Sequence, residues 1–497
     1  MGVAMKYILG IDQSTQGTKA MLFDEDGSMV KRCDLPHRQI ITEKGWVSHD
    51  MNEVLANTLA VCRQVIEDSG VDKKDVVGVG ISNQRETSVL WDKNTGKPMA
   101  DAIVWQCSRS AEICRREHIL EAAEMIRQHS GLQLSPYFPA GKITWLLENT
   151  PGAREKAAEH TICHGTVDSF LIFNLTKEHA YKTDYSNASR TQLFNLHTLK
   201  WDEEICYLFG IDPANMAEVC DSNSCFGMTD LDGYLEEAIP IHGALGDSHA
   251  ALFGQNCVRS GMTKTTYGTG SSVMMNVGNK PILSPHGVVS SIGWGMDGVV
   301  DYVLEGNINY TGAVISWLKD DVKLIASAKE TEELARTANP EDKTYLVPAF
   351  TGLGAPYWKD DCTGVITGIT RTTGKNEIVR AGLDCIAYQI ADIVRIMAED
   401  SKLPLAELRV DGGPTGNAYL MQFQSDLLRI PVRVAAIEEL SGMGAAFAAG
   451  LGMRVFDRER IYSAGARKTY LPEAPVEIIG EKLAGWKAAV AQVIGEN

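Results

Sequence analysis

Residues 7–23 read YILGIDQSTQGTKAMLF, and residues 265–277 read TTYGTGSSVMMNV. Each stretch consists of an apolar strand, a short tip of small and polar residues, and a second apolar strand, which is the pattern of a β-hairpin. Because the same pattern occurs near residue 12 and again near residue 268, the sequence predicts two related halves. We place the boundary between them near residue 250.

Strands and helices alternate after each hairpin. In the first half, a helical pattern over residues 51–68 precedes an apolar strand over residues 76–81. In the second half, we expect helices over residues 312–318, 321–337, 376–398, 417–428 and 442–450, and strands over residues 345–348 and 408–411. The alternation predicts an α/β fold with two domains, residues 1–250 and 251–497, and a cleft between them.

The composition excludes several classes of protein. The chain has 497 residues, with 47 basic and 64 acidic side chains, so its formal net charge is −17. An acidic surface repels phosphate backbones, and no compensating run of Lys and Arg occurs, so nucleic acid is not an expected partner. No apolar run reaches the ~18 residues of a membrane helix, so we expect no membrane insertion. The eleven cysteines form no close pairs, which is typical of a cytoplasmic protein with reduced thiols.

The two hairpin tips are candidate phosphate-binding sites. Backbone N–H groups of two facing tips can hold a nucleotide phosphate when a metal ion neutralises the remaining charge. The sequence contains no G-x-x-x-x-G-K-[ST] motif, which excludes the other common phosphate loop. Each tip alone would be interpreted as an ordinary turn, and their duplication favours the phosphate-binding hypothesis. The candidate residues are Thr15, Gly17 and Thr18 in the first tip and Gly268, Thr269 and Gly270 in the second.

Charged and aromatic residues follow several of the predicted strands. Asp12 and Asp247 stand at strand ends, where a parallel sheet presents its ligands. Asp247 also precedes a predicted helix, so it could equally cap that helix. Arg85 and Glu86 could form an exposed turn, and Trp105 could be an ordinary core aromatic.

Five longer runs carry a specific resemblance. They are NQRET at 83–87, AIVWQC at 102–107, TDYSNASRT at 183–191, PAFTGLGAPYW at 348–358 and MQFQSD at 421–426. These runs resemble the FGGY family of carbohydrate kinases, and within it the glycerol kinase group, from about Tyr7 to beyond Gly450. The resemblance implies two actin-like (ribonuclease H-like) domains with ATP and an acceptor in the cleft. It also implies Mg²⁺ and a homo-oligomer, either a dimer or a tetramer.

The resemblance assigns roles to individual residues. It makes Asp247 the general base for the acceptor hydroxyl and places Asp12 and Asp247 near Mg²⁺. Positions that match nucleotide contacts are Thr15, Gly17, Thr18, Lys19, Gly268, Thr269, Gly312, Ser316, Gly412 and Asn417. Positions that match the acceptor site are Arg85, Glu86, Trp105, Tyr137, Asp247, Ser248 and Ser272. The implied reaction is transfer of the γ-phosphate of ATP to a hydroxyl of glycerol or a closely related polyol or sugar.

Four positions depart from the pattern of the glycerol kinase group. Lys19 replaces an Arg and Ser316 replaces a Gln on the nucleotide side, whereas Ser248 replaces a Gln and Ser272 a Phe on the acceptor side. The two acceptor-side changes enlarge the site and remove an amide that would bind a hydroxyl. Three hypotheses therefore stay open: a glycerol kinase with a relaxed pocket, a kinase for a polyol or ketose of four or five carbons with poor glycerol activity, and a catalytically silent sugar sensor on the kinase fold.

Overall fold

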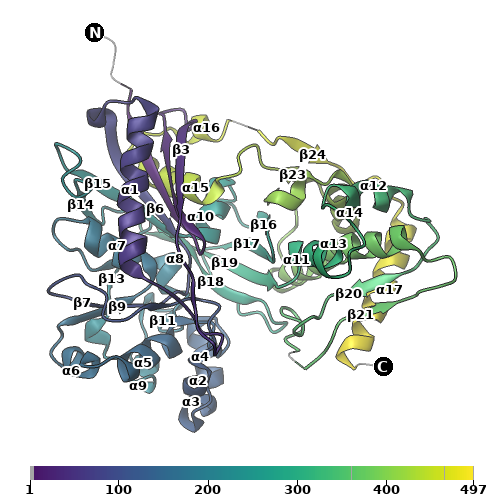
Figure 1. Cartoon of the computed structure of the whole chain (residues 1–497), viewed down its shortest axis with the longest axis horizontal. Coiled ribbons are helices and arrows are strands. Elements are labelled where there is room, and N and C mark those ends of the chain that lie inside the picture. Colours follow the sequence, from purple (N-terminus) through teal and green to yellow (C-terminus); the bar gives the residue numbers. More distant parts are fainter. Residues whose placement is uncertain (1–4, 360, 464, 496–497) are drawn as a thin grey trace.

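The computed structural model describes residues 5–359, 361–463 and 465–495, and it contains two large β-sheets with helices packed on them (Figure 1). The first sheet has the strand order β14-β15-β6-β1-β2-β3. Its strands are β1 (Tyr7–Gln13), β2 (Gly17–Phe23), β3 (Met29–Pro36), β6 (Val76–Asn83), β14 (Gly227–Thr229) and β15 (Ile239–Gly246). β1, β2 and β3 form an antiparallel meander, and β6 and β15 continue the sheet in parallel with β1.

The second sheet repeats this arrangement, with the strand order β18-β19-β17-β16-β22-β23-β24. Its strands are β16 (Thr263–Tyr267), β17 (Ser271–Gly278), β18 (Val289–Met296), β19 (Val299–Ile308), β22 (Leu408–Asp411), β23 (Val432–Val434) and β24 (Lys468–Tyr470). β16, β17 and β19 are antiparallel neighbours, and β22 and β23 run parallel to β16. The two predicted hairpins are therefore β1–β2 and β16–β17, and the predicted α/β class with two related units is confirmed.

Helices cover both sheets. α1 (Met51–Ser69) packs on β2 and β3, and α13 (Lys375–Ser401) packs on β17 and β19. Further helices of the second part include α11 (Gly312–Ser316), α12 (Glu330–Thr337), α14 (Ala418–Leu428), α16 (Arg458–Ile461) and α17 (Val476–Ile494). A small sheet consists of β20 (Tyr345–Val347) and β21 (Val365–Thr367). None of the helices within the described residues is both long and apolar enough to span a bilayer.

The segment between β6 and β15 builds a lateral region beside the first sheet (Figure 1). It holds the short strands β7 (Val89–Asp92), β8 (Ala102–Ile103), β9 (Ile162–Gly165), β10 (Lys182–Asp184), β11 (Phe194–Asn195), β12 (Lys200–Trp201) and β13 (Glu218–Cys220). Its helices are α2 (Ala111–Cys114), α3 (Glu117–Glu121), α4 (Ala123–Ser130), α5 (Pro139–Asn149), α6 (Ala153–Ala158), α7 (Val167–Leu175), α8 (Tyr185–Ala188) and α9 (Glu203–Leu208). β4 (Ile40–Ile41) pairs with β5 (Val47–His49), and β5 pairs with β8, which attaches this region to the chain that follows β3.

One predicted helix is wrong over half of its length. We expected a helix over residues 321–337, but the regular helix α12 covers only Glu330–Thr337. A wider, π-type turn over Trp317–Asp321 extends α11, and Lys323 then adopts a left-handed backbone conformation with φ of 58°. Because a helix cannot continue through a residue of positive φ, the chain leaves the helix there and starts a new one seven residues later.

Two helices join the two sheets through unusually close backbone contacts. α10 (Asp247–Gly254) leads from β15 toward β16, and α15 (Leu440–Gly452) follows β23 but packs on β1, β6, β15 and α10. A Cβ atom on Gly10 of β1 would lie 2.7 Å from the carbonyl oxygen of Gly442, and one on Gly444 would overlap the carbonyl oxygen of Ala250. Only glycine fits where two backbones meet this closely.

We predict that Gly444→Ala destabilises the protein, because its new methyl group has no room between α15 and α10. Overpacking of this kind typically costs about 1–3 kcal/mol. Gly480→Ala is the matched control, since Gly480 lies in helix α17 and an added Cβ would meet nothing within 4 Å. The control should raise the free energy of unfolding by about 0.5–1 kcal/mol. Urea unfolding of both variants tests this, and equal stability of Gly444→Ala and the wild type would contradict the packing argument.

Candidate active site

The first hairpin tip, between β1 and β2, connects to two other parts of the chain. Trp105 Nε1 donates a hydrogen bond to Thr15 Oγ1 at 2.9 Å. Lys19 Nζ lies 2.7 Å from the Glu439 carboxylate, which comes just before α15. Gly17 and the buried Thr18 begin β2 directly after the tip. Lys19 is thus ion-paired with a residue that follows it by 420 positions.

The second tip, between β16 and β17, is built from backbone in close contact. The carbonyl oxygens of Gly268 and Thr269 accept hydrogen bonds from the N–H groups of Gly312 and Ala313 at 2.9 and 3.0 Å. A Cβ on Gly312 would lie 2.7 Å from the Gly268 carbonyl oxygen, and Gly412 has φ of 96° with its Cα against Tyr267. The structure therefore brings together Gly268, Thr269, Gly312 and Gly412, which were predicted separately.

A cavity of about 690 Å³ lies among α11, α12, α13 and α14, next to the second tip. Three predicted residues line it, namely Gly312, Ser316 and Asn417, and its apolar wall consists of Ile315, Leu383, Ile386 and Leu420. Asn417 also caps α14, because its Oδ1 accepts a hydrogen bond from the Leu420 N–H at 3.0 Å. The volume falls in the range of sites for cofactors and drug-sized ligands, about 300–1,000 Å³.

Two carboxylates meet at one edge of the first sheet. Asp12 lies near the end of β1, and Asp247 directly follows β15; both strands run parallel to β6, which lies between them. The N-cap of α10 is Gly246, so Asp247 occupies the first helical position and is not the capping residue. Ser82 Oγ donates a hydrogen bond to Asp12 Oδ1 at 3.0 Å.

The electrostatics of this pair suit a divalent cation. Burial and, to a smaller extent, the negative charge of Asp247 raise the pKa of Asp12 to about 6, although Lys19 opposes both effects. Within the described residues no cluster of three or more His, Cys, Asp or Glu could hold a metal ion. Mg²⁺ is usually bound by one or two carboxylates together with substrate phosphates and water. Asp12 and Asp247 therefore fit a Mg²⁺ ion that also binds phosphate.

Arg85 and Glu86 are buried, so the alternative of an exposed turn is wrong. Only 6% of Arg85 and 2% of Glu86 are exposed. Arg85 Nε lies 3.1 Å from Asp247 Oδ1, and Arg85 NH2 donates to Ser248 Oγ at 3.3 Å. Glu86 Oε1 accepts a hydrogen bond from Arg190 Nε at 2.6 Å.

The two predicted aromatic residues of the acceptor side lie next to each other. The rings of Trp105 and Tyr137 meet edge to face, with centroids 5.7 Å apart. Both side chains are partly buried, and the Trp105 indole N–H is bonded to the first tip, so Trp105 is not an ordinary core aromatic. The pair can form a wall against which the carbon chain of a small polyol packs.

Two buried charged residues were not predicted as part of the site. Glu305 on β19 is fully buried, pairs with Arg85 and Arg190, and accepts a hydrogen bond from Ser272 Oγ at 3.3 Å. An acidic residue inside the apolar strand Val299–Ile308 was the signal available in the sequence. Arg190 lies within the run 183–191, but nothing in that run indicates its partners.

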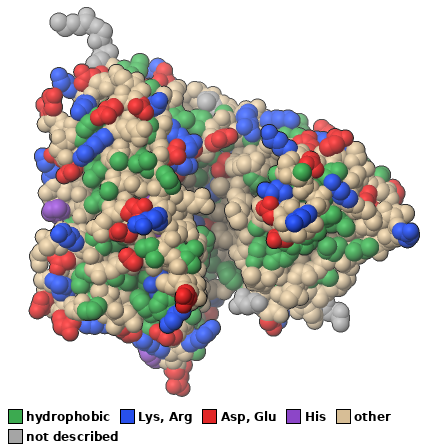
Figure 2. All heavy atoms as spheres, viewed as in Figure 1, with side chains coloured by type: hydrophobic (Ala, Val, Ile, Leu, Met, Phe, Trp, Pro, Cys, Tyr) green, Lys and Arg blue, Asp and Glu red, His purple; other side chains and the backbone are tan. Residues whose placement is uncertain are grey.

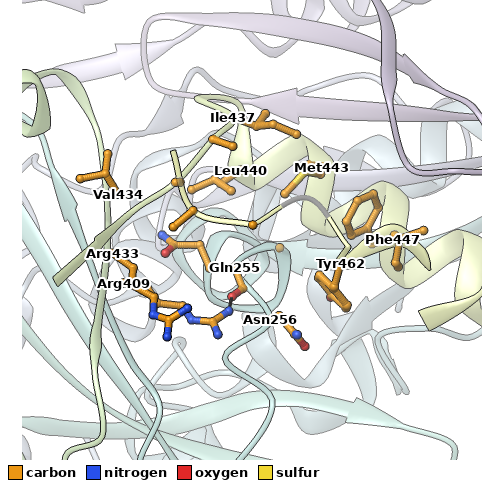
Figure 3. A pocket seen from close by; sticks show the side chains of 16 residues that line it. Gln255, Asn256, Arg409, Arg433, Val434, Ile437, Leu440, Met443, Phe447 and Tyr462 are labelled. Atoms are coloured by element: carbon orange, nitrogen blue, oxygen red, sulfur yellow. Dashed lines mark hydrogen bonds between the residues drawn. The ribbon is translucent and has the colours of Figure 1, made fainter. Parts of the chain in front are cut away.

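The space-filling view shows a groove between the part of the molecule that carries β1–β3 and the part that carries α11–α14 (Figure 2). A separate cavity of about 210 Å³ lies elsewhere, against α15 (Figure 3). Leu440, Met443 and Phe447 form its apolar side. Arg409 and Arg433 also line this cavity, and Glu407 pairs with both. It contains none of the predicted site residues.

Comparison with known proteins agrees with this geometry. The family model of the N-terminal domain of FGGY carbohydrate kinases matches residues 7–254, and that of the C-terminal domain matches residues 263–453. Glycerol kinase 1 of Thermotoga maritima is 47% identical over 99% of this chain and 100% of its own length. The glycerol kinase of Geobacillus sp. is 43% identical, with 98% of each chain covered.

Solved structures give the same result. The crystal structure of Plasmodium falciparum glycerol kinase with ADP superimposes with a TM-score of 0.91 at 34% identity and covers 98% of each chain. Gluconate kinase from Lactobacillus acidophilus shares the fold, with a TM-score of 0.86 at 20% identity over 99% of this chain and 97% of its own. The chain belongs to the FGGY family of carbohydrate kinases and is a kinase that uses a hydroxyl group as acceptor.

Proposed function

We propose that the protein transfers the γ-phosphate of ATP to a hydroxyl group of glycerol, with Asp247 as general base. The observation that carries this proposal is the position of Asp247, whose carboxylate contacts the buried Arg85 and lies at the sheet edge shared with Asp12. The names of the full-length relatives, glycerol kinases at 43–47% identity, support glycerol as the acceptor.

The chain's own residues would position the reacting groups. Phosphoryl transfer passes through a loose transition state, so placement and charge neutralisation matter more than strong proton abstraction. Asp247 accepts the hydroxyl proton while Arg85 keeps its carboxylate in place from 3.1 Å. Asp12 and Asp247 would hold Mg²⁺, which neutralises phosphate charge when bound.

The nucleotide would be bound on both sides of the groove. We assign the phosphates to Thr15, Gly17, Thr18 and Lys19 of the first hairpin and to Gly268 and Thr269 of the second. The 690 Å³ cavity, with Gly312, Ser316 and Asn417 in its wall and Gly412 near the second tip, would take the nucleoside. In this arrangement Lys19 exchanges its partner Glu439 for phosphate.

The acceptor would lie against Trp105 and Tyr137, with its hydroxyl groups toward Arg85, Glu86 and Asp247. The comparisons favour glycerol over the two other hypotheses, a kinase for a longer polyol or ketose and a silent sugar sensor. Ser248 and Ser272, which contact Arg85 and Glu305, complete this site with short side chains.

We also propose two domains, with a boundary near residue 250, in a cytoplasmic homo-oligomer. The two sheets support the division, because the first uses strands up to residue 246 and the second begins at residue 263. All eleven cysteines are free thiols, which suits a reducing compartment. The resemblance to the family supports a dimer or tetramer.

We predict that Asp247→Asn keeps ATP binding but lowers kcat with glycerol by about 10²–10⁴-fold, the usual contribution of a general base. Asp232→Asn, at an exposed turn far from the groove, is the control and should retain full activity. Coupled steady-state assays and calorimetric titration with ATP provide the two measurements. Turnover close to wild type would exclude Asp247 as the base.

The hydrogen bond between Trp105 and Thr15 should affect nucleotide binding. Trp105→Phe and Thr15→Val each remove it, and each should raise the KM for ATP about 2–10-fold, the equivalent of one hydrogen bond. Because both changes remove the same bond, the double variant should be little worse than either single variant. Trp201→Phe removes an indole hydrogen bond to Ala217 outside the site and should leave the KM unchanged. Additive effects in the double variant would contradict a direct coupling.

Replacing both short acceptor-side residues tests the size of the acceptor pocket. The double variant Ser248→Gln/Ser272→Phe should raise kcat/KM for glycerol relative to four-carbon polyols by roughly tenfold, because it restores an amide and fills space. The measurement is the ratio of kcat/KM values for glycerol and erythritol. An unchanged ratio would show that these two positions do not set acceptor preference.

A further inference from the structure

We propose that Glu305 is the positioning residue of the acceptor site, because its buried carboxylate fixes the two arginines that orient Asp247 and Glu86. This inference rests on the proposed function, in which Asp247 and Glu86 contact the acceptor. Glu305 stands on β19 of the second sheet, whereas both arginines and both acceptor-side carboxylates come from the first 250 residues.

Glu305 binds Arg85 with both of its oxygens. Oε1 lies 2.7 Å from Arg85 NH2, and Oε2 lies 2.9 Å from Arg85 NH1. Such two-point pairs of a guanidinium and a carboxylate fix orientation as well as charge. With both terminal nitrogens held, the Arg85 Nε is directed to Asp247 at 3.1 Å.

The same carboxylate also holds Arg190. Arg190 NH1 lies 2.8 Å from Glu305 Oε2, and Arg190 Nε donates to Glu86 Oε1 at 2.6 Å. Arg190 is only 1% exposed, so it has no solvent to replace either partner. The position of Glu86 is therefore set through Arg190 by Glu305.

The neighbouring arginines favour the ionised form of Glu305. Burial by itself would raise its pKa, but the guanidinium groups of Arg190 and Arg85 outweigh burial and hold the pKa below its ordinary value. Removing one member of a buried ion network is costly, because it leaves the remaining charges incompletely paired. Without the Glu305 charge, Asp247 is the nearest carboxylate still in contact with Arg85.

This arrangement makes the second half of the chain necessary for the acceptor site. Arg85 and Arg190 can meet Glu305 only when β19 lies against the first half. Loss of the Glu305 charge should turn Arg85 toward Asp247. The carboxylate of Asp247, the proposed base, would then be held in a full ion pair with Arg85. The acceptor reaction should then suffer, while the nucleotide cavity, which does not include Glu305, stays intact.

The test compares Glu305→Gln, Glu305→Asp and the control Asp301→Asn in steady-state kinetics with glycerol and ATP. Asp301 lies on the same strand and accepts a hydrogen bond from Trp294 Nε1 at 3.1 Å, away from both arginines. We expect Glu305→Gln to lower kcat/KM for glycerol about 100-fold and to leave the KM for ATP within about twofold. Glu305→Asp should recover part of the loss because it keeps the charge, and Asp301→Asn should match the wild type.

Several outcomes would overturn the positioning role. A folded Glu305→Gln protein with glycerol kinetics close to wild type would do so, as would equal changes in the KM values for glycerol and ATP, which indicate a general structural defect. If Glu305→Gln does not fold, the same selective loss must appear in Glu305→Asp, and full activity of that variant would refute the inference.

Failure of the proposed function would give a different result. If the wild type itself does not phosphorylate glycerol, the proposed function is wrong. Crystal structures of the Glu305 variants then test the positioning role. The structure of Glu305→Gln, or of Glu305→Asp if the first does not fold, should show Arg85 displaced toward Asp247. An Arg85 in its original place would refute the role independently of activity.

Discussion

The close packing of helix α15 against the first sheet is the constraint on which the rest of the structure depends. The helix comes from the end of the second half, yet it lies on β1, β6 and β15 and against α10 with hardly any side chains between the backbones. β1 ends beside Asp12, and α10 begins with Asp247. The backbone contacts that join the two sheets thus also set the positions of the two carboxylates.

Much of the fold could be predicted from the sequence because its signals are local. The two hairpins, the helix α1 and the strand Leu408–Asp411 follow from apolar periodicity and from small polar tips within a few residues. The start of α12 at Glu330 could not be predicted, because the helical pattern covers residues 321–329 as well, while the backbone turns at Lys323.

The candidate site could be predicted only in part, because only some of its residues have a local signal in the sequence. Residues at strand ends and in tips, such as Asp12, Asp247 and Gly268, have a local pattern or match a family motif. The link between Arg85 and Glu305 joins positions 220 residues apart. The acidic residue in an apolar strand marks Glu305 as unusual, but it does not indicate Arg85 as the partner. The burial of Arg85 and Glu86 was equally invisible, because adjacent charged residues usually indicate a surface.

The ion pair between Lys19 and Glu439 has a consequence for which anions can enter the groove. Lys19 already has a tethered carboxylate partner at 2.7 Å, which acts at a high effective concentration. A small anion would replace the Lys19–Glu439 ion pair with a single contact, so it gains little binding free energy from displacing Glu439. In the proposed binding mode, a triphosphate reaches both hairpin tips at once and offsets the loss of this ion pair with several contacts. In the binding mode proposed above, the pair therefore favours a ligand with many anionic oxygens over free phosphate and simple sugar phosphates.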